Sequence, residues 1–352
     1  MGKKAVIKYF QLLSVLFTLI LAVITFVGLY AGDTPPSDNI YKAFLCLGLP
    51  ILLICNIIAV IYWAIRFKLW IVVPVFTLIC CWNYIGTFYQ MRSKPADSNS
   101  GLKVATFNVH SFNKESSGFI GKDILNSMIK NNVDVICFQE YSDIISLTQE
   151  SLTKVYETQY PHAVTGAGDM VIFSKYPIKE NKKIDFDGTN NSAMWADIDV
   201  NGKIIRVINV HLQTTGINGA LHRMSKREKK GEVITNQEMA ETISSSYADQ
   251  FKIRGGQAIT VANEIRTCNK PMVLCGDFND SPYSFCYQTI LGGMKDGFVE
   301  AGSGWMYTYR GSKAPLRIDY MFHSPDLKCV NYYVDKEIDY SDHYPVFMRV
   351  RW

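Results

Sequence analysis

Three long apolar stretches dominate the first quarter of the chain. They occupy residues 12–31, 43–65 and 69–91, and none of them contains a charged side chain. A helix needs about 20 predominantly apolar residues to cross the hydrocarbon core of a bilayer. Each stretch is therefore long enough for one span, and the pattern predicts a membrane anchor over residues 1–91 with three transmembrane helices.

A cleaved signal peptide is the alternative for the first stretch, because Lys3, Lys4 and Lys8 precede it. The stretch is long for the apolar core of a signal peptide, and no A-x-A-like cleavage site follows it. Two more apolar stretches come after it, so a transmembrane helix is the interpretation we favour.

The basic residues between the stretches predict an orientation. Arg66 and Lys68 lie between the second and third stretches, on the same side as the lysines near the N-terminus. The positive-inside rule then places the N-terminus in the cytoplasm and the chain after residue 91 outside, although Arg92 and Lys94 argue against this. The prediction is a multi-pass protein of the inner or plasma membrane, with its larger part on the periplasmic or extracytoplasmic side.

The polar, breaker-rich residues 92–101 are predicted to be a linker. Beyond it, over 102–352, short β-rich runs alternate with helical stretches. Many strands with few helices predict an α+β domain in which two sheets pack face to face with helices outside. Expected strands are 102–109, 133–138, 170–174, 193–200, 203–211, 271–276, 317–323 and 344–350, and expected helices are 120–131, 142–153 and 254–267.

Charge is divided unevenly along the chain. The net charge of +4 belongs to the N-terminal part, and residues 95–352 carry about two more acidic than basic side chains. This disfavours a general DNA-binding protein held by its overall charge. Five basic residues do cluster between 223 and 230. They form either a solvated helix face or a flap that meets phosphate or an anionic membrane surface.

Polar side chains stand at the ends of five apolar strands. Asp277 and Asn279 follow one of them, and their spacing puts both on one face of extended chain. A single polar strand end is usually solvated, but five together predict one cleft. Its candidate residues are Asn108, Glu140, His211, Asp277, Asn279, Asp319, Asp342 and His343. The remaining histidines, His110, His162, His222 and His323, are interpreted as non-functional.

Carboxylate and amide oxygens suit a hard cation such as Mg²⁺ or Mn²⁺ rather than zinc. A histidine paired with an aspartate can orient or deprotonate water, and a second imidazole can protonate a leaving oxygen. The residue types therefore predict metal-assisted hydrolysis of a phosphate ester. The plainer alternatives are that Asn108 closes a turn and that His211 is a satisfied buried histidine.

Six segments in this order resemble the endonuclease/exonuclease/phosphatase superfamily, which includes DNase I-like and neutral sphingomyelinase-like enzymes. They are "TFNVHSF", "CFQE", "INVHLQT", "GDFNDSP", "RIDYMF" and "SDHYPV", and the resemblance covers about 102–352. It implies a four-layer α/β sandwich with the cleft at one edge, here in a membrane-anchored, bacterial-type member.

The resemblance also implies roles for the candidate residues. Glu140 becomes the main metal ligand, with Asn108 and Asp342 nearby. The catalytic set comprises Asp277 and Asn279, which position water or phosphate, His343 oriented by Asp319, and His211 as the second imidazole. Which imidazole acts as acid and which as base stays open.

Attachment to a membrane narrows the substrate, because a domain about ten residues from the bilayer meets lipid headgroups at high effective concentration. We therefore expect a phosphodiester or phosphomonoester on a lipid or small molecule. A Mg²⁺-dependent nuclease acting on DNA is the alternative within the same chemistry. A catalytically inactive membrane scaffold or binding module is the alternative outside it, and no protein partner can be inferred.

Overall fold

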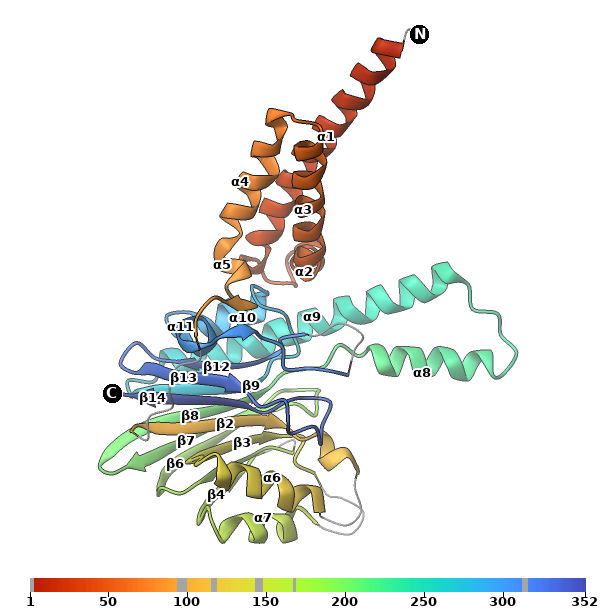
Figure 1. Cartoon of the computed structure of the whole chain (residues 1–352). Helices are drawn as coiled ribbons and strands as arrows, with labels where there is room; N and C mark the ends of the chain where they lie inside the picture. Colours follow the sequence, from red (N-terminus) through yellow and green to blue (C-terminus); the bar gives the residue numbers. More distant parts are fainter. Residues whose placement is uncertain (1–2, 94–99, 115–118, 143–147, 167–168, 312–315) are drawn as a thin grey trace.

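Two six-stranded mixed sheets form the larger part of the computed structural model (Figure 1). The first has the order β13-β14-β2-β3-β5-β4 and the second the order β10-β12-β9-β8-β7-β6, with parallel pairs β2–β3 and β8–β9. The structure describes residues 3–93, 100–114, 119–142, 148–166, 169–311 and 316–352. Most of the predicted linker 92–101 therefore lies outside the described residues.

The strands β2, β3, β5, β7, β8, β9, β12 and β14 lie within about two residues of the expected positions, whereas β4, β6, β10 and β13 were not expected from the sequence. In the first sheet they are β13 Lys328–Val334, β14 Val346–Arg351, β2 Leu102–Asn108, β3 Val135–Gln139, β5 Val171–Ser174 and β4 His162–Thr165. In the second they are β10 Lys295–Asp296, β12 Asp319–His323, β9 Met272–Asp277, β8 Lys203–His211, β7 Ser192–Val200 and β6 Ile178–Asp185.

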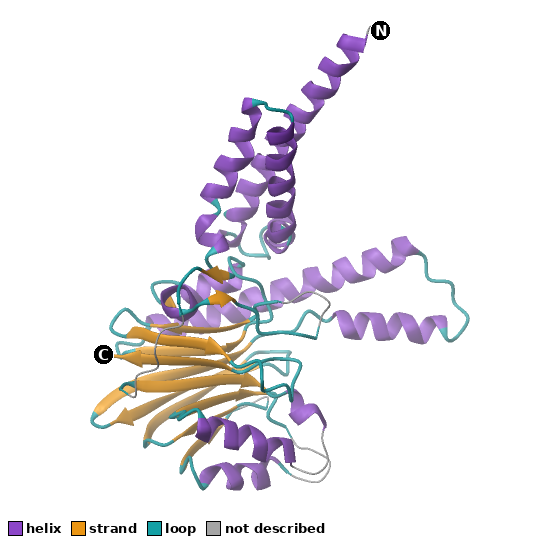
Figure 2. Cartoon of the chain, viewed as in Figure 1, coloured by secondary structure: helices purple, strands orange, loops and turns teal. Residues whose placement is uncertain are grey.

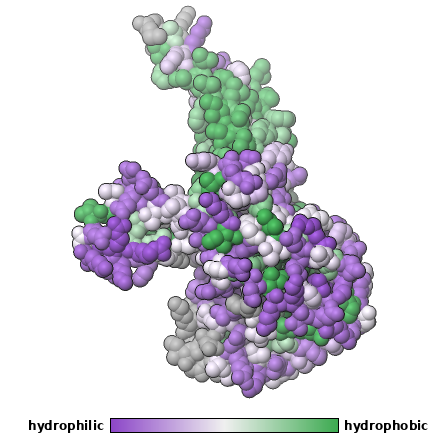
Figure 3. All heavy atoms as spheres, turned by 180° about the vertical axis from the view of Figure 1, so that it is seen from behind, coloured by the Kyte–Doolittle hydropathy of each residue, from purple (hydrophilic) through white to green (hydrophobic). Residues whose placement is uncertain are grey.

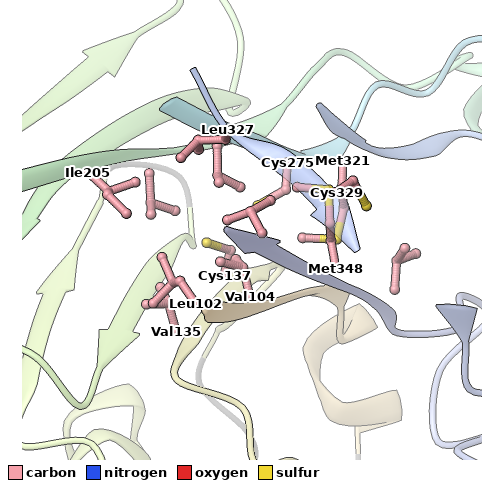
Figure 4. Close-up of a cluster of buried hydrophobic side chains, with 14 of the residues drawn as sticks. Leu102, Val104, Val135, Cys137, Ile205, Cys275, Met321, Leu327, Cys329 and Met348 are labelled. Atoms are coloured by element: carbon pink, nitrogen blue, oxygen red, sulfur yellow. The ribbon is translucent and has the colours of Figure 1, made fainter. Parts of the chain in front are cut away.

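The main core lies between the sheets. Leu102, Val104 and Val135 from the first sheet meet Val207 and residues such as Cys275 and Met321 from the second (Figure 4). All seven residues of β2 are buried, because both faces of this central strand are covered. Strands buried on both faces lack a strict alternation of apolar and polar residues, and β2 shows this, since Leu102 and Val104 belong to the core between the sheets and Ala105 and Phe107 to the core under the outer helices.

Helices cover the outer face of each sheet (Figure 2). α6 (Phe119–Lys130) and α7 (Gln149–Glu157) pack their apolar residues against the first sheet. α9 (Asn236–Arg266) and α10 (Phe285–Leu291) do the same on the second. The order helix, sheet, sheet, helix confirms the predicted α+β sandwich.

The N-terminal helices differ from the three predicted spans. Only α1 (Lys3–Leu29) is long and apolar enough by itself to cross a bilayer among the described residues. The second stretch is divided into α2 (Ile40–Leu47) and α3 (Leu49–Ile65), which are bent by 55° and count as one span at most. Proline at the start of α3 explains the break, because its ring favours the first turn of a new helix.

The third predicted span is the clearest error. It contains η2 (Leu69–Ile71), α4 (Val72–Cys80), the four-residue α5 (Trp82–Ile85) and β1 (Tyr89–Gln90). Its apolar helical segment, Leu69–Cys80, is too short to span a bilayer. The prediction of three continuous transmembrane helices is therefore wrong. The helices nevertheless expose a broad apolar surface, which stands out from the polar surface of the sandwich (Figure 3).

The N-terminal helices are joined to the sandwich by a packed interface. Tyr84 packs edge-on against Tyr283, and Phe44 of α2 packs against Phe251 of α9. β1 pairs with β11 (Gly304–Trp305), which follows α11 (Gly297–Ala301). The base of the helical part is therefore packed against the α9–α10 side of the sandwich, while α1, α3 and α4 project away from it (Figure 1).

The basic insertion forms a helical hairpin. α8 (Ile217–Glu228) and the N-terminal half of α9 project from the sandwich side by side (Figure 1). The helix expected at 254–267 is thus the C-terminal half of a 31-residue helix. We call residues 217–250 the helical arm.

Candidate active site

The predicted strand ends converge at one edge of the sandwich. Asp277 at the end of β9 is in register with His211 on β8 and with Asp319 on β12. Asn108 comes from the other sheet, and its Nδ2 donates to Asp277 Oδ2 and to Glu140 Oε1, both at 3.0 Å. One amide therefore holds two carboxylates of different sheets in place.

His343 and Asp319 form a buried pair. His343 Nδ1 lies 2.9 Å from Asp319 Oδ2, and His343 Nε2 lies 3.7 Å from Asp277 Oδ2. Burial alone would lower the pKa of His343, but the negative charges of Asp319 and Asp277 outweigh burial and raise it to about 10. The imidazole is therefore positively charged at neutral pH.

Asp277 is held in a conformation that needs a glycine before it. A Cβ at Gly276, where φ is +138°, would lie 1.9 Å from the carbonyl oxygen of Val210. Glycine lets β9 approach β8 closely enough to bury Asp277. Burial raises the pKa of Asp277 to about 7, although the charge of His343 opposes it.

Asn279 secures the loop after Asp277. Its backbone N–H donates to Asp277 Oδ1 at 2.8 Å, and its Nδ2 donates to the carbonyl oxygen of Leu212 at 3.0 Å. The predicted pair Asp277 and Asn279 is thus brought together, with Asn279 tying β9 to the segment that follows β8.

His211 has a ring nitrogen without a partner. Its Nε2 is buried, makes no hydrogen bond with any residue that the structure describes, and lies 3.8 Å from Glu140 Oε1 and 3.9 Å from Asp277 Oδ2. Burial lowers the pKa of His211, and the nearby charge of Glu140 compensates only in part. A neutral imidazole with a free nitrogen is a group ready to exchange a proton or a hydrogen bond with a bound molecule.

Two of the side chains described above reach a cleft of about 600 Å³. Glu140 and His211 form part of its wall, and Gln213 and Thr214 continue it beyond β8. Gln250 and Ile253 of α9 also line it, so the base of the helical arm borders the cleft. A volume of this size suits a small-molecule-sized group.

Buried side chains behind the cleft shape its wall. Gln257 Oε1 accepts a hydrogen bond from the backbone N–H of Gln213, and Arg254 Nη1 donates to the Gln213 carbonyl at 3.0 Å. Arg254 also lies 3.4 Å from Asp280. Arg254 and Gln257 therefore hold the loop at Gln213, whereas Gln139 is fully buried and packs within the core.

Two residues near the site were not among the candidates predicted from the sequence. His110, interpreted there as non-functional, places its Nδ1 3.3 Å from Asp342 Oδ1 and 3.7 Å from Glu140 Oε2. It lies two residues after Asn108, and this proximity to a candidate residue was the available signal. Tyr309 was also missed, and its ring centre lies 4.9 Å from that of His343.

The turn that carries His110 has unusual backbone angles. His110, Ser111 and Phe112 have φ between 45° and 53°, and Glu140 and Asn279 have φ of 53° and 52°. Residues other than glycine adopt positive φ at an energetic cost, and residues with such strained backbone cluster at functional sites. Their concentration at this edge supports its assignment as the site.

Two groups of side chains have the composition of a cation site. The first, fully buried, comprises Asp277, Asp319 and His343, whose ligand atoms lie within 4.8 Å of one another. The second comprises Glu140, which lines the cleft, and Asp342, with side chains 32% and 31% exposed. In the first group, Asp319 is already engaged by His343, while both carboxylates of the second are partly open to solvent.

Comparisons with known proteins agree with this geometry. Residues 105–343 match the model of the endonuclease/exonuclease/phosphatase family, and residues 10–88 match a domain of unknown function, DUF8431. A search of curated proteins found no match.

Solved structures with the same fold include TDP2 of D. rerio complexed with a single-strand DNA product (14% identity, TM-score 0.52, 72% of this chain and 100% of that chain). TDP2 of Caenorhabditis elegans (15%, 0.51, 71% and 97%) and an endonuclease/exonuclease/phosphatase protein of Bacteroides vulgatus (17%, 0.50, 72% and 99%) are similar to a comparable degree. At these identities the likeness establishes the fold. Because the family model covers more than half of the sequence, the chain belongs to the endonuclease/exonuclease/phosphatase family, whose members are metal-dependent phosphoester hydrolases.

Proposed function

We propose that this chain is a membrane-anchored, Mg²⁺- or Mn²⁺-dependent phosphoesterase that acts on a phosphodiester or phosphomonoester of a lipid or small molecule. The observation that carries the proposal is the convergence of a charged imidazole, an unpartnered neutral imidazole and partly exposed carboxylates at one edge of the sandwich. A scaffold or binding module has no need of two imidazoles in different protonation states.

Glu140 and Asp342 are the side chains that would hold the metal, with Asn108 fixing Glu140 through its amide. Their oxygen atoms are the donors that Mg²⁺ and Mn²⁺ prefer. Their partial exposure leaves room for water and a phosphate oxygen beside them. When bound, the metal supplies Lewis-acid stabilisation of charge on the phosphoryl group.

Three side chains would carry out the remaining steps of phosphoester hydrolysis. Positively charged His343, held by Asp319, donates a hydrogen bond to a phosphoryl oxygen. Asp277, whose pKa is raised to about 7 by burial, is suited to accept a proton from the attacking water. Neutral His211, whose Nε2 lies 3.8 Å from Glu140 Oε1, would form a hydrogen bond with the leaving oxygen of the substrate.

The substrate class rests on the N-terminal helices and on the helical arm. α1, α3 and α4 expose many large apolar side chains, as expected of a surface in contact with lipid. The arm carries exposed Lys226, Lys229 and Lys230, and its base lines the cleft. Basic side chains near an anionic leaflet each contribute about 1 kcal/mol of attraction. Both features favour a substrate presented at a membrane surface.

The proposal is tested with the full-length protein in lipid nanodiscs. Hydrolysis is measured with Mg²⁺ or Mn²⁺ on bis-p-nitrophenyl phosphate, p-nitrophenyl phosphate, a phospholipid and sphingolipid panel, and plasmid DNA. We expect turnover of a chromogenic ester and of at least one lipid, and about a 10²- to 10⁴-fold lower rate for Glu140→Gln. Glu228→Gln, on the exposed end of α8, is the matched control and should behave as wild type.

The possible results separate the alternatives. Equal rates for wild type and Glu140→Gln on every substrate would refute the enzymatic role and leave the scaffold. Cleavage of DNA without turnover of any lipid would replace the lipid substrate by nucleic acid, while the metal-dependent chemistry would stand.

A further inference from the structure

We propose that His110 is a ligand of the metal ion, through Nδ1, together with Glu140 and Asp342. This inference rests on the proposed function, since it concerns the same site. It has a consequence of its own, because an imidazole ligand favours Mn²⁺ and other first-row transition metals over Mg²⁺, which prefers oxygen donors.

The distances fit ligands that share one cation. Neighbouring ligands of an octahedral ion with bonds of about 2.1 Å lie about 3 Å apart. His110 Nδ1 is 3.3 Å from Asp342 Oδ1 and 3.7 Å from Glu140 Oε2. The nitrogen thus lies beside both carboxylates, with a spacing that small side-chain movements would adapt to a metal.

Backbone hydrogen bonds hold the turn that carries the His110 ring. The backbone N–H of His110 donates to Asn108 Oδ1 at 3.0 Å, and that of Ser111 donates to the Glu140 carbonyl at 3.0 Å. The two bonds join the turn to the end of β2 and to Glu140, which directly follows β3. Three consecutive positive φ angles, from His110 to Phe112, are the energetic cost of bringing the imidazole here.

A plain ion pair is a weak explanation of this arrangement. The His110 side chain is 42% exposed, and ion pairs at such exposure contribute little to stability. That contribution is smaller than the energetic cost of holding three consecutive residues at positive φ. A second observation points to a ligand at the same place. The buried, unpartnered His211 Nε2 is directed at Glu140 from the other side, 3.8 Å from Oε1.

The test uses Mn²⁺ as the probe and electron paramagnetic resonance as the readout, on the full-length protein in nanodiscs. Affinity is measured from the loss of the free Mn²⁺ signal, and imidazole coordination from ¹⁴N modulation of the bound ion. The main variant is His110→Asn, because asparagine tolerates positive φ and its amide oxygen gives no comparable nitrogen coupling. His110→Ala is the second variant, and His222→Asn, exposed on α8, is the control.

We expect wild type and His222→Asn to show one strongly coupled nitrogen. Both His110 variants should lose it and bind Mn²⁺ at least about tenfold more weakly, while Mg²⁺ affinity, measured by competition, changes less than about threefold. Persistence of the coupling in both His110 variants, or its loss only in His211→Ala, would overturn the role of His110. A wild type that binds Mn²⁺ without nitrogen coupling would do the same while leaving the proposed function intact. A wild type that binds no divalent ion would overturn the proposed function itself.

Discussion

Replacing His343 with glutamine is expected to lower kcat for phosphoester hydrolysis by about 10³-fold, with a much smaller change in KM. Loss of one preorganised donor to the charge that develops in the transition state costs about 10² to 10³ in kcat. His343 is also the buried cation of the site, between Asp319 at 2.9 Å and Asp277 at 3.7 Å. Glutamine keeps a hydrogen-bond donor of similar reach but removes the charge. Initial rates on a chromogenic diester at saturating metal provide the measurement.

The pH profile separates a chemical role from a structural one. Because the pKa of His343 is raised to about 10, the cation is present below that pH and is lost as the pH rises through it. Wild-type activity should therefore fall on the alkaline side near pH 10. Asp319→Asn removes the nearest negative charge and should move this fall to lower pH. A His343→Gln enzyme that keeps more than a tenth of wild-type kcat would show that the imidazolium is dispensable.

Replacing Asp296 with alanine is expected to lower the free energy of unfolding by about 3–5 kcal/mol. Arg317 is fully buried and donates to Asp296 Oδ1 at 2.7 Å and to the Thr87 carbonyl at 2.8 Å. Removing one partner of a buried pair leaves the other charge without compensation, which typically costs this amount. Tyr287 would lose its acceptor as well, since its hydroxyl donates to Asp296 Oδ2.

Urea unfolding of the full-length protein in detergent, followed by tryptophan fluorescence, measures the loss. Asp187→Ala replaces an exposed aspartate and should stay within about 0.5 kcal/mol of wild type. The double variant Asp296→Leu/Arg317→Met removes both charges together, so it should be more stable than Asp296→Ala. A loss below about 1 kcal/mol in Asp296→Ala would show that Arg317 finds another anion or reaches water.

Most of the strands, and the candidate residues at their ends, were predictable from the sequence for a local reason. A strand buried on both faces is a mainly apolar run, and a polar residue marks its end, as at Asn108 and Asp277. The β7–β8 hairpin was equally clear, because Asn201 and Gly202 both adopt the positive φ that a tight hairpin turn requires. Strand order then brings these ends to one edge.

What could not be predicted depends on tertiary contacts. A hydropathy pattern identifies long apolar stretches but does not show where a helix ends within one. The helix breaks at Gly48 and Cys81 were therefore not predicted. His110 follows a strand in an ordinary-looking turn, and only the positive φ angles bring its ring to Asp342. Arg254 looked like the start of a helix, whereas it is a buried residue in the middle of one.

The hydrogen bond from Arg317 to Thr87 determines where the chain can be truncated for expression. The homology to known hydrolases begins near residue 105, and a fragment starting there would be the natural choice for expression. Such a fragment would lose the carbonyl of Thr87. The buried guanidinium of Arg317 would then lack one of its hydrogen-bond acceptors, and Arg317 is only two residues from Asp319. It would also uncover Phe251 and Tyr283. The working unit that folds and can be purified should therefore include the helices that precede the hydrolase.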